Sequence, residues 1–195
     1  IWKKAAKNLP WYPGDTVNMG IGQGDILVTP LQMAVVASIF ANKGKIVRPK
    51  MLKGYDQPEE SASNTNELYI EGIDQSGWTQ MTSAMEDVVH LGNQGFRENG
   101  TAWAYIGQDI PYRMAGKSGT AQVIEIKQGQ KYSSEELEEN QRNHAWFIAF
   151  APVSEPTIAL SVIVENGGGG SSIAGPVARK VIDSYLVSNE LKSDG

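Results

Sequence analysis

The sequence predicts an α/β domain of the α+β type, in which helices flank an antiparallel sheet of three strands. A continuous apolar run at 145–151 and strict alternation at 157–164 predict strands, because successive side chains of a strand lie on opposite faces. Apolar residues at helical spacing in two long segments predict the helices. With 195 residues and 41% hydrophobic composition, the chain can bury one core.

The first third of the chain predicts two helices. Four apolar residues lie at helical spacing in a short first helix: Trp2, Ala5, Ala6 and Leu9. We interpret them as the end of an element that starts outside this chain, and a basic membrane-surface helix is the weaker alternative. Thr29 followed by Pro30 predicts a helix over 30–42, since Thr caps free amides and Pro suits a first turn. This helix is apolar nearly all round, which predicts burial on most sides.

The middle third predicts a surface loop and a packed helix. Residues 54–66 are polar and contain turn-forming residues, which is typical of a loop. A helix is predicted over 75–91, with an apolar stripe formed by Trp78, Met81, Met85 and Val88. Because Met commonly fills gaps in cores, we interpret this stripe as packing rather than as a cofactor site.

The last third predicts the sheet. Strands are expected at about 114–126, 144–152 and 157–165, and the short turn between the last two predicts that they pair antiparallel. A short acidic helix is expected near 133–139, where Ser133 and Glu136 match a capping box. A final helix should start at Pro176 and lay one face on the sheet: Val177, Val181 and Tyr185, with Ile182 and Leu186 beside them.

Composition argues against several function classes. A net charge of −5 with no basic cluster argues against a nucleic-acid partner. The absence of cysteine excludes disulfides and thiolate metal sites. The glutamates near 135–139 are typical of a solvated face, so no metal and no cofactor are expected. We interpret His144 as a satisfied polar group, and His90 as one that interacts with the carboxyl end of its helix.

The segment from Gly116 to Thr120 carries the most specific chemistry. It places an ammonium at Lys117, hydroxyls at Ser118 and Thr120 and a bare backbone at Gly119 on one predicted strand. Such groups suit a carboxylate and a developing oxyanion. In a regular strand Lys117 and Gly119 point away from Ser118 and Thr120, and only a bulge at Gly119 would turn all of them toward one cleft. An ordinary strand with a polar edge is the alternative.

This segment resembles the Lys-Ser-Gly or Lys-Thr-Gly motif of serine acyltransferases that react with penicillin. Six further blocks occur in the order found in class B penicillin-binding proteins, most like their elongation-specific branch: Trp11-Tyr12-Pro13-Gly14-Asp15, Gly20-Ile21-Gly22-Gln23-Gly24, Thr29-Pro30-Leu31-Gln32-Met33, Asn99-Gly100-Thr101-Ala102, Ala149-Phe150-Ala151-Pro152 and Glu165-Asn166-Gly167-Gly168. Together they resemble the C-terminal half of the family's transpeptidase domain.

The resemblance implies a role for each motif residue. Lys117 would hold the proton network and favour the terminal carboxylate of a D-Ala-D-Ala stem peptide, which Ser118 and Thr120 would bind through their hydroxyls. The backbone N–H of Thr120 would form half of the oxyanion hole, and Gly119 would leave room for the acyl group. β-Lactams would act as substrate mimics. The implied location is the periplasmic face of the inner membrane, with a glycan polymerase and scaffold proteins as partners and a membrane anchor outside this chain.

The sequence also departs from the family pattern. No serine here has a lysine three residues later, and Ser-x-Asn is absent, so the nucleophile must come from outside residues 1–195. The family's sheet has five strands, so we expect 157–165 to form an edge within this chain, where a missing strand would pair.

Three other interpretations compete. The glycines at 20–24 suggest dinucleotide binding, but Asp25 replaces the last glycine and no acidic residue follows at the required distance. Gly167 to Gly170 could cradle a phosphate, although a flexible turn fits better because no Lys-Ser or Lys-Thr pair follows. A non-catalytic module that binds peptides by strand addition remains the alternative function.

Overall fold

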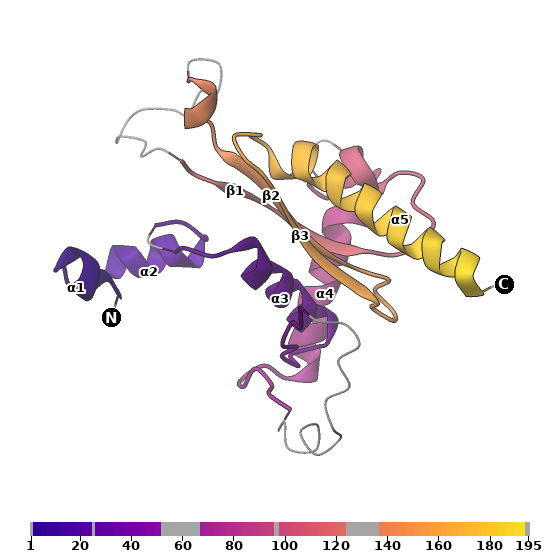
Figure 1. Ribbon diagram of the computed structural model, residues 1–195, viewed down its shortest axis with the longest axis horizontal. Helices are drawn as coiled ribbons and strands as arrows, with labels where there is room; N and C mark the ends of the chain where they lie inside the picture. Colours follow the sequence, from indigo (N-terminus) through magenta and orange to yellow (C-terminus); the bar gives the residue numbers. More distant parts are fainter. Residues whose placement is uncertain (1, 25, 52–66, 96–97, 124–136, 194–195) are drawn as a thin grey trace.

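A computed structural model of the chain describes residues 2–24, 26–51, 67–95, 98–123 and 137–193. Its centre is an antiparallel sheet in the order β1-β2-β3, formed by Ala115–Ala121, His144–Ala151 and Ile158–Val164 (Figure 1). The predicted three-stranded sheet and the hairpin of the last two strands are therefore confirmed. The first strand ends at Ala121, five residues before its predicted end, and the last three of those five residues lie outside the described residues.

Helices cover both faces of the sheet (Figure 1). On one face, α5 (Gly175–Ser193) and the short π-helical turns η2 (Trp103–Gly107) and η4 (Gly170–Ala174) pack over one core cluster. On the other face, α3 (Pro30–Ala41) packs over a second cluster. The helix α4 (Gln75–His90) contributes to both clusters and packs against β1. The sheet is thus the middle layer of the fold.

The predicted N-terminal cap of α3 is confirmed. Thr29 Oγ1 accepts from the Gln32 amide at 3.2 Å, and Gln32 Oε1 accepts from the Thr29 amide at 2.8 Å, so α3 opens with a reciprocal capping box. In α4, Met85 is buried in the cluster between the sheet and α3, and Trp78 is buried against Phe40 of α3 and the turn at Gly44, so their predicted packing role is confirmed. The predicted surface loop at 54–66 and most of the predicted acidic helix lie outside the described residues.

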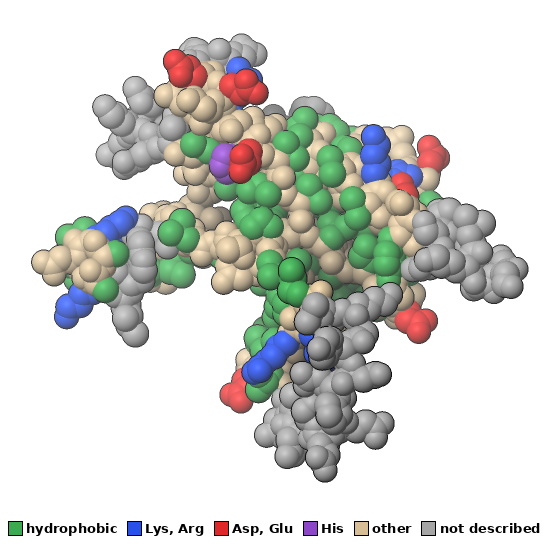
Figure 2. Space-filling model, in the orientation of Figure 1, with side chains coloured by type: hydrophobic (Ala, Val, Ile, Leu, Met, Phe, Trp, Pro, Cys, Tyr) green, Lys and Arg blue, Asp and Glu red, His purple; other side chains and the backbone are tan. Residues whose placement is uncertain are grey.

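The face that α5 buries is only partly the predicted one, since Ile182 and Leu186 pack into the core as predicted but three of their neighbours do not. Ala178 and Ile182 are fully buried, whereas Val177, Val181 and Tyr185 are 43%, 47% and 40% exposed. Because η4 leads directly into α5, it places Ala174 and the residues one and two turns later against the sheet. The apolar pattern alone favoured burial of the larger side chains of Val177, Val181 and Tyr185. Figure 2 shows hydrophobic side chains exposed over the region of the sheet and α5.

The predicted burial of the 30–42 helix on most sides is wrong. Of α3 only Ala37 is fully buried and Leu31 is 55% exposed, while the other residues from 33 to 41 are half-buried where α3 packs on β2, β3 and α4. In α1 (Trp2–Lys7) the predicted apolar face is exposed at Ala5 and Ala6. Lys3 is the buried residue instead, because its ammonium meets the Asp15 carboxylate at 2.5 Å.

The α-helix over residues 13–20 was not predicted from the sequence. Residues Pro13–Gly20 form α2, which starts at a proline and is capped where Asp15 Oδ2 accepts from the Tyr12 amide at 2.8 Å. Glycines at both ends and short length hide this helix from periodicity arguments. The pair α1 and α2 projects away from the layers around the sheet (Figure 1).

Arg179 ties α5 to the segment that follows η2. Its guanidinium donates to the backbone carbonyls of Ile106, Gln108 and Asp109 at 3.0, 2.6 and 2.9 Å. These carbonyls lie where η2 ends, so they have no helical partner. A single planar cation therefore satisfies a helix end and fixes α5 over the sheet.

Candidate functional site

The motif strand β1 is regular throughout. Each residue from Ala115 to Ala121 pairs with one residue of β2, from Phe150 back to His144, so no bulge occurs at Gly119. Lys117 and Gly119 therefore lie on the same sheet face as α3, and Ser118 and Thr120 lie on the face of η4 and α5. The question that the sequence left open is settled in favour of a split motif.

What the motif residues share is the open edge of β1. Lys117 Nζ donates to the Ser118 carbonyl at 2.6 Å, and the Gln23 side-chain amide donates to the Thr120 carbonyl at 3.3 Å. Both carbonyls accept bonds from groups outside the sheet, and in an antiparallel pair the N–H and C=O of one residue point to the same side. The backbone amides of Ser118 and Thr120 therefore face away from β2, toward an edge without a strand partner among the described residues.

This edge is accessible to a ligand. Lys117, Gly119 and Thr120 are exposed, and Ser118 is half-buried. The arrangement offers one ammonium, two hydroxyls and two outward backbone amides along three residues of strand. An extended ligand that carries a carboxylate could add to such an edge through its backbone and place its charge beside the lysine.

The side of β1 toward α5 is closed by a glycine. Gly170, the first residue of η4, is buried on the paired residues Gly119 and Trp146. A Cβ at Gly170 would lie 2.3 Å from the Gly119 carbonyl oxygen and 2.4 Å from that of Trp146. The glycine at 170 thus allows η4 to contact the backbone of the motif strand directly.

The glycines from Gly167 to Gly170 link β3 to η4, and their predicted flexibility stays a prediction. The amide of Gly167 donates to Val164 O at 3.2 Å, and that of Gly168 donates to Asn143 O at 2.8 Å. Gly168 has a φ of +83°, which glycine adopts without strain, and a Cβ at Gly167 would lie 2.9 Å from the Val164 side chain.

The glycines from Gly20 to Gly24 form a structural turn between α2 and α3. The amides of Gly22 and Gln23 donate to the carbonyls of Met19 and Asn18 at 3.0 and 2.9 Å, and Gly22 has a φ of +73°. The turn carries the Gln23 side chain to Thr120, 97 residues away in the sequence. Sequence reasoning missed Gln23, because its contact with β1 exists only in the folded chain.

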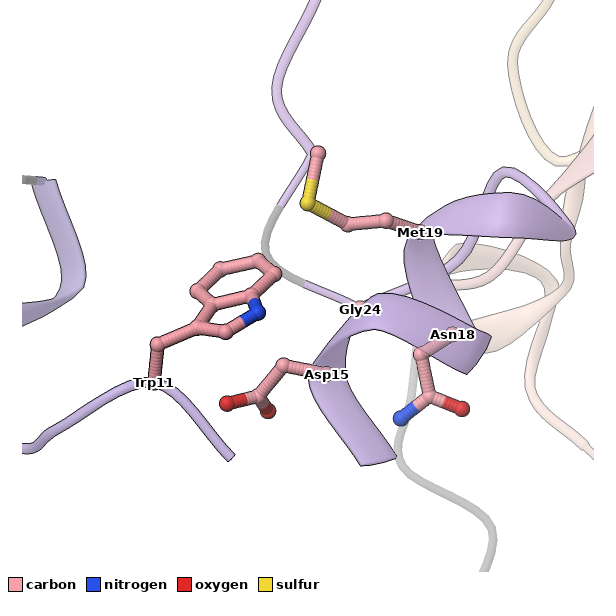
Figure 3. A pocket seen from close by; sticks show the side chains of 5 residues that line it. All are labelled: Trp11, Asp15, Asn18, Met19 and Gly24. Atoms are coloured by element: carbon pink, nitrogen blue, oxygen red, sulfur yellow. The ribbon is translucent and has the colours of Figure 1, made fainter. Parts of the chain in front are cut away.

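A small pocket of about 190 Å³ lies at α2, lined by Trp11, Asp15, Asn18, Met19 and Gly24 (Figure 3). Its one acid is already engaged, because Asp15 pairs with Lys3 and accepts from the Tyr12 amide, which lowers the pKa of its carboxyl. The pocket therefore holds no free acid or base for chemistry, and the β1 edge is the stronger candidate site.

The two histidines act as hydrogen-bond acceptors. His144 Nδ1 accepts from the Asn166 amide at 2.9 Å, as expected for a satisfied polar group. His90 Nε2 accepts from the Met114 amide at 3.1 Å, so its ring is bound as the neutral form, while its predicted interaction with the helix dipole stays a prediction. Within the described residues, no three His, Asp or Glu side chains gather in a way that could hold a metal ion.

The His90 contact predicts a pH dependence of stability. Burial, with a smaller effect of the Arg113 charge that outweighs nearby Glu86, lowers the pKa of His90 below its usual value of 6.5. Below that value the unfolded chain takes up a proton that the folded chain resists, so stability present at neutral pH should fall as the solution is acidified. Thermal melts of wild type and His90→Gln between about pH 8 and pH 5 measure this, because glutamine accepts without titrating. Equal slopes of melting temperature against pH would contradict the prediction.

The fold and the β1 edge define a penicillin-binding transpeptidase domain, and sequence comparison agrees. Residues 3–183 match the penicillin binding protein transpeptidase domain, so the chain belongs to this family. It is 41% identical over 189 residues to peptidoglycan D,D-transpeptidase MrdA of Haemophilus influenzae, and 33% identical over 190 residues to MrdA of Escherichia coli K12. These matches cover 95% and 96% of the chain, which spans 28% and 29% of the two relatives.

Solved structures give the same result. The structure of Pseudomonas aeruginosa PBP2 in complex with WCK 5153 superposes with a TM-score of 0.72 at 36% identity, covering 95% of this chain and 36% of that one. The complex of PBP2 and MreC from Helicobacter pylori superposes with a TM-score of 0.68 at 27% identity, covering 95% and 30%. The resemblance to elongation-specific penicillin-binding proteins is therefore confirmed.

Proposed function

We propose that this chain is the C-terminal half of a transpeptidase domain, and that the protein to which it belongs is a serine-type peptidoglycan D,D-transpeptidase. Its family and its relatives support the reaction class. The observation that carries the proposal is the open edge of β1, where Lys117 and the outward amides of Ser118 and Thr120 lie together.

In the proposed mechanism this strand binds the acyl donor while the serine comes from another part of the domain. The stem peptide adds to the β1 edge, where its terminal carboxylate lies in the plane of the sheet and meets Lys117 from one face and the hydroxyls of Ser118 and Thr120 from the other. The serine oxygen attacks the penultimate D-Ala carbonyl, and the Thr120 amide stabilises the oxyanion. The terminal D-Ala leaves with a proton, and the amine of a second stem peptide then takes the acyl group. Gly119 leaves the strand bare beside the reacting carbonyl.

The same edge accounts for β-lactam binding in this proposal. A β-lactam presents a carboxylate and a reactive carbonyl, which are the two groups that Lys117 and the Thr120 amide would receive. No group in this mechanism requires a cofactor, and none is proposed.

Partners and location follow the relatives. A Helicobacter pylori PBP2 is known in complex with MreC, so we propose a scaffold protein of that kind as a partner, together with a glycan polymerase of the elongation machinery. The proposed place of action is the periplasmic face of the bacterial inner membrane. No helix in the described part of the chain is long and apolar enough to cross a membrane.

A non-catalytic peptide-binding module is the second candidate. Both outer strands of the sheet, β1 and β3, lack a strand partner on one side among the described residues, as predicted for 157–165. Unpaired edges bind extended peptides through backbone hydrogen bonds. Such a module would bind peptides without being acylated by a penicillin.

Labelling by a fluorescent penicillin tests the proposal. The full-length protein should form a stoichiometric covalent adduct on a serine outside this chain, whereas residues 1–195 alone should form none, because no Ser-x-x-Lys occurs here. Intact-mass and peptide mass spectrometry give the result. An adduct on a serine within the chain, Ser118 included, would contradict the assignment of the nucleophile, and an unlabelled full-length protein would favour the peptide-binding module.

A further inference from the structure

A contact between Gln23 and the motif strand has no role in the proposed mechanism so far. The Gln23 Nε2 atom lies 3.3 Å from the Thr120 carbonyl oxygen, on the open side of β1. The amide of Thr120 faces this same side, since both groups of a residue point one way in an antiparallel pair. Gln23 therefore donates a hydrogen bond to the carbonyl of Thr120, and the backbone amide of the same residue stabilises the oxyanion in the proposed mechanism.

Gln23 is held so that it can restrain this strand. Its own amide is fixed to Asn18 O at 2.9 Å, and Gly24 beyond it has a φ of +82°. The turn is therefore anchored to the end of α2, in the segment that projects from the sheet layers (Figure 1). On its other side the strand is held by η4, where Gly170 contacts the Gly119 backbone. The peptide groups at Gly119 and Thr120 are thus held from two directions.

We infer that Gln23 is a positioning residue for the oxyanion site, an inference that rests on the proposed function. Its side-chain amide fixes the Thr120 residue at the strand edge, so that the Thr120 N–H points to the place where negative charge develops. A neutral donor suits this place, because a second cation would compete with Lys117 for the substrate carboxylate. Since oxyanion stabilisation depends on the direction of a preorganised donor, a small rotation of Thr120 weakens it.

The inference predicts a loss of reaction rate without a loss of binding. In the full-length protein, Gln23→Ala should lower the acylation rate constant about 3- to 10-fold, the change expected when one hydrogen bond is removed. The dissociation constant of the noncovalent complex should stay unchanged, because Gln23 contacts the strand and not the ligand. Stopped-flow acylation by a fluorescent penicillin separates the two constants. Gln80→Ala, at an exposed position of α4, is the matched control and should behave as wild type.

A second variant tests whether the donated hydrogen bond is the cause. Gln23→Glu keeps the shape of the side chain but lacks a donor when ionised, so its acylation rate should be low at neutral pH. Protonation restores an O–H donor, so the ratio of variant to wild-type rate should rise as the pH approaches about 5. A residue that merely stabilises the fold would not show this recovery.

The outcomes distinguish the inference from the proposed function. A wild-type protein that is not acylated overturns both. Wild-type acylation with equal rates in both Gln23 variants overturns the inference alone. So does a weaker dissociation constant at an unchanged rate, which would make Gln23 a ligand contact. A lower melting temperature in both variants, without recovery of the Gln23→Glu rate at low pH, would also overturn it.

Discussion

Replacing Lys117 with alanine in the full-length protein should slow acylation by a β-lactam roughly 10² to 10⁴-fold, the largest kinetic effect expected of any residue in this chain. The ammonium is exposed at the open edge of β1, where its present partner is the Ser118 carbonyl at 2.6 Å. A bound carboxylate would take over this donor, and the proton network around the serine would lose its cation in the variant. The substitution therefore removes both a charge-assisted contact and a route for protons.

Stability should hardly change in the same variant, because an exposed lysine contributes little to folding. Stopped-flow acylation is therefore measured beside thermal melts, and Lys180→Ala, at an exposed position of α5, serves as the control. Unchanged acylation in Lys117→Ala would favour the alternative interpretation, in which the Lys-Ser-Gly-Thr segment is an ordinary strand with a polar edge. A rate loss that parallels general unfolding would do the same.

The sheet and the long helices could be predicted because their signals are local. Alternation in β3 and the cap at Thr29 before Pro30 each depend on residues a few positions apart, and both are confirmed. Burial was harder to predict, since it depends on what packs against a helix. On α5, Ile182 is buried as predicted, but Val177 and Val181 are exposed and Ala178 is buried in their place, because η4 sets the direction from which α5 approaches the sheet.

The sequence predicted which residues form the candidate site, but it could not predict how their side chains are arranged. Lys117, Ser118, Gly119 and Thr120 could be read from the sequence, and whether they share a face could not, because that depends on the pairing register with β2. The hydrogen bond of Gln23 to Thr120 joins residues 97 positions apart, and no local pattern reports such a contact. Gly170 was hidden for a related reason: four successive glycines suggest freedom, whereas this one is needed for close packing.

Gly170→Ala should give the largest loss of stability predicted for this chain. Its φ lies outside the left-handed range, so alanine can adopt the backbone conformation without strain. The cost comes from contact alone, because the new methyl group would lie 2.3 Å from the Gly119 carbonyl oxygen and 2.4 Å from that of Trp146. Those atoms belong to paired strands and can move only with the sheet. We expect the free energy of unfolding to fall by about 3 kcal/mol, the upper part of the usual range for overpacking.

Gly175→Ala provides the matched control for this prediction, five residues later. It is also buried, but a Cβ there would find its nearest neighbours at 3.7 Å, an ordinary contact distance, within a helical backbone. Alanine should therefore be neutral there or stabilise by up to about 1 kcal/mol through helix propensity. Denaturant unfolding of both variants gives the two free energies, and the acylation rate of Gly170→Ala should fall as well, because the displaced Gly119 carries Thr120 with it. Similar stability in the two variants would show that η4 moves aside easily, and that the backbone of the motif strand does not depend on close contact with Gly170.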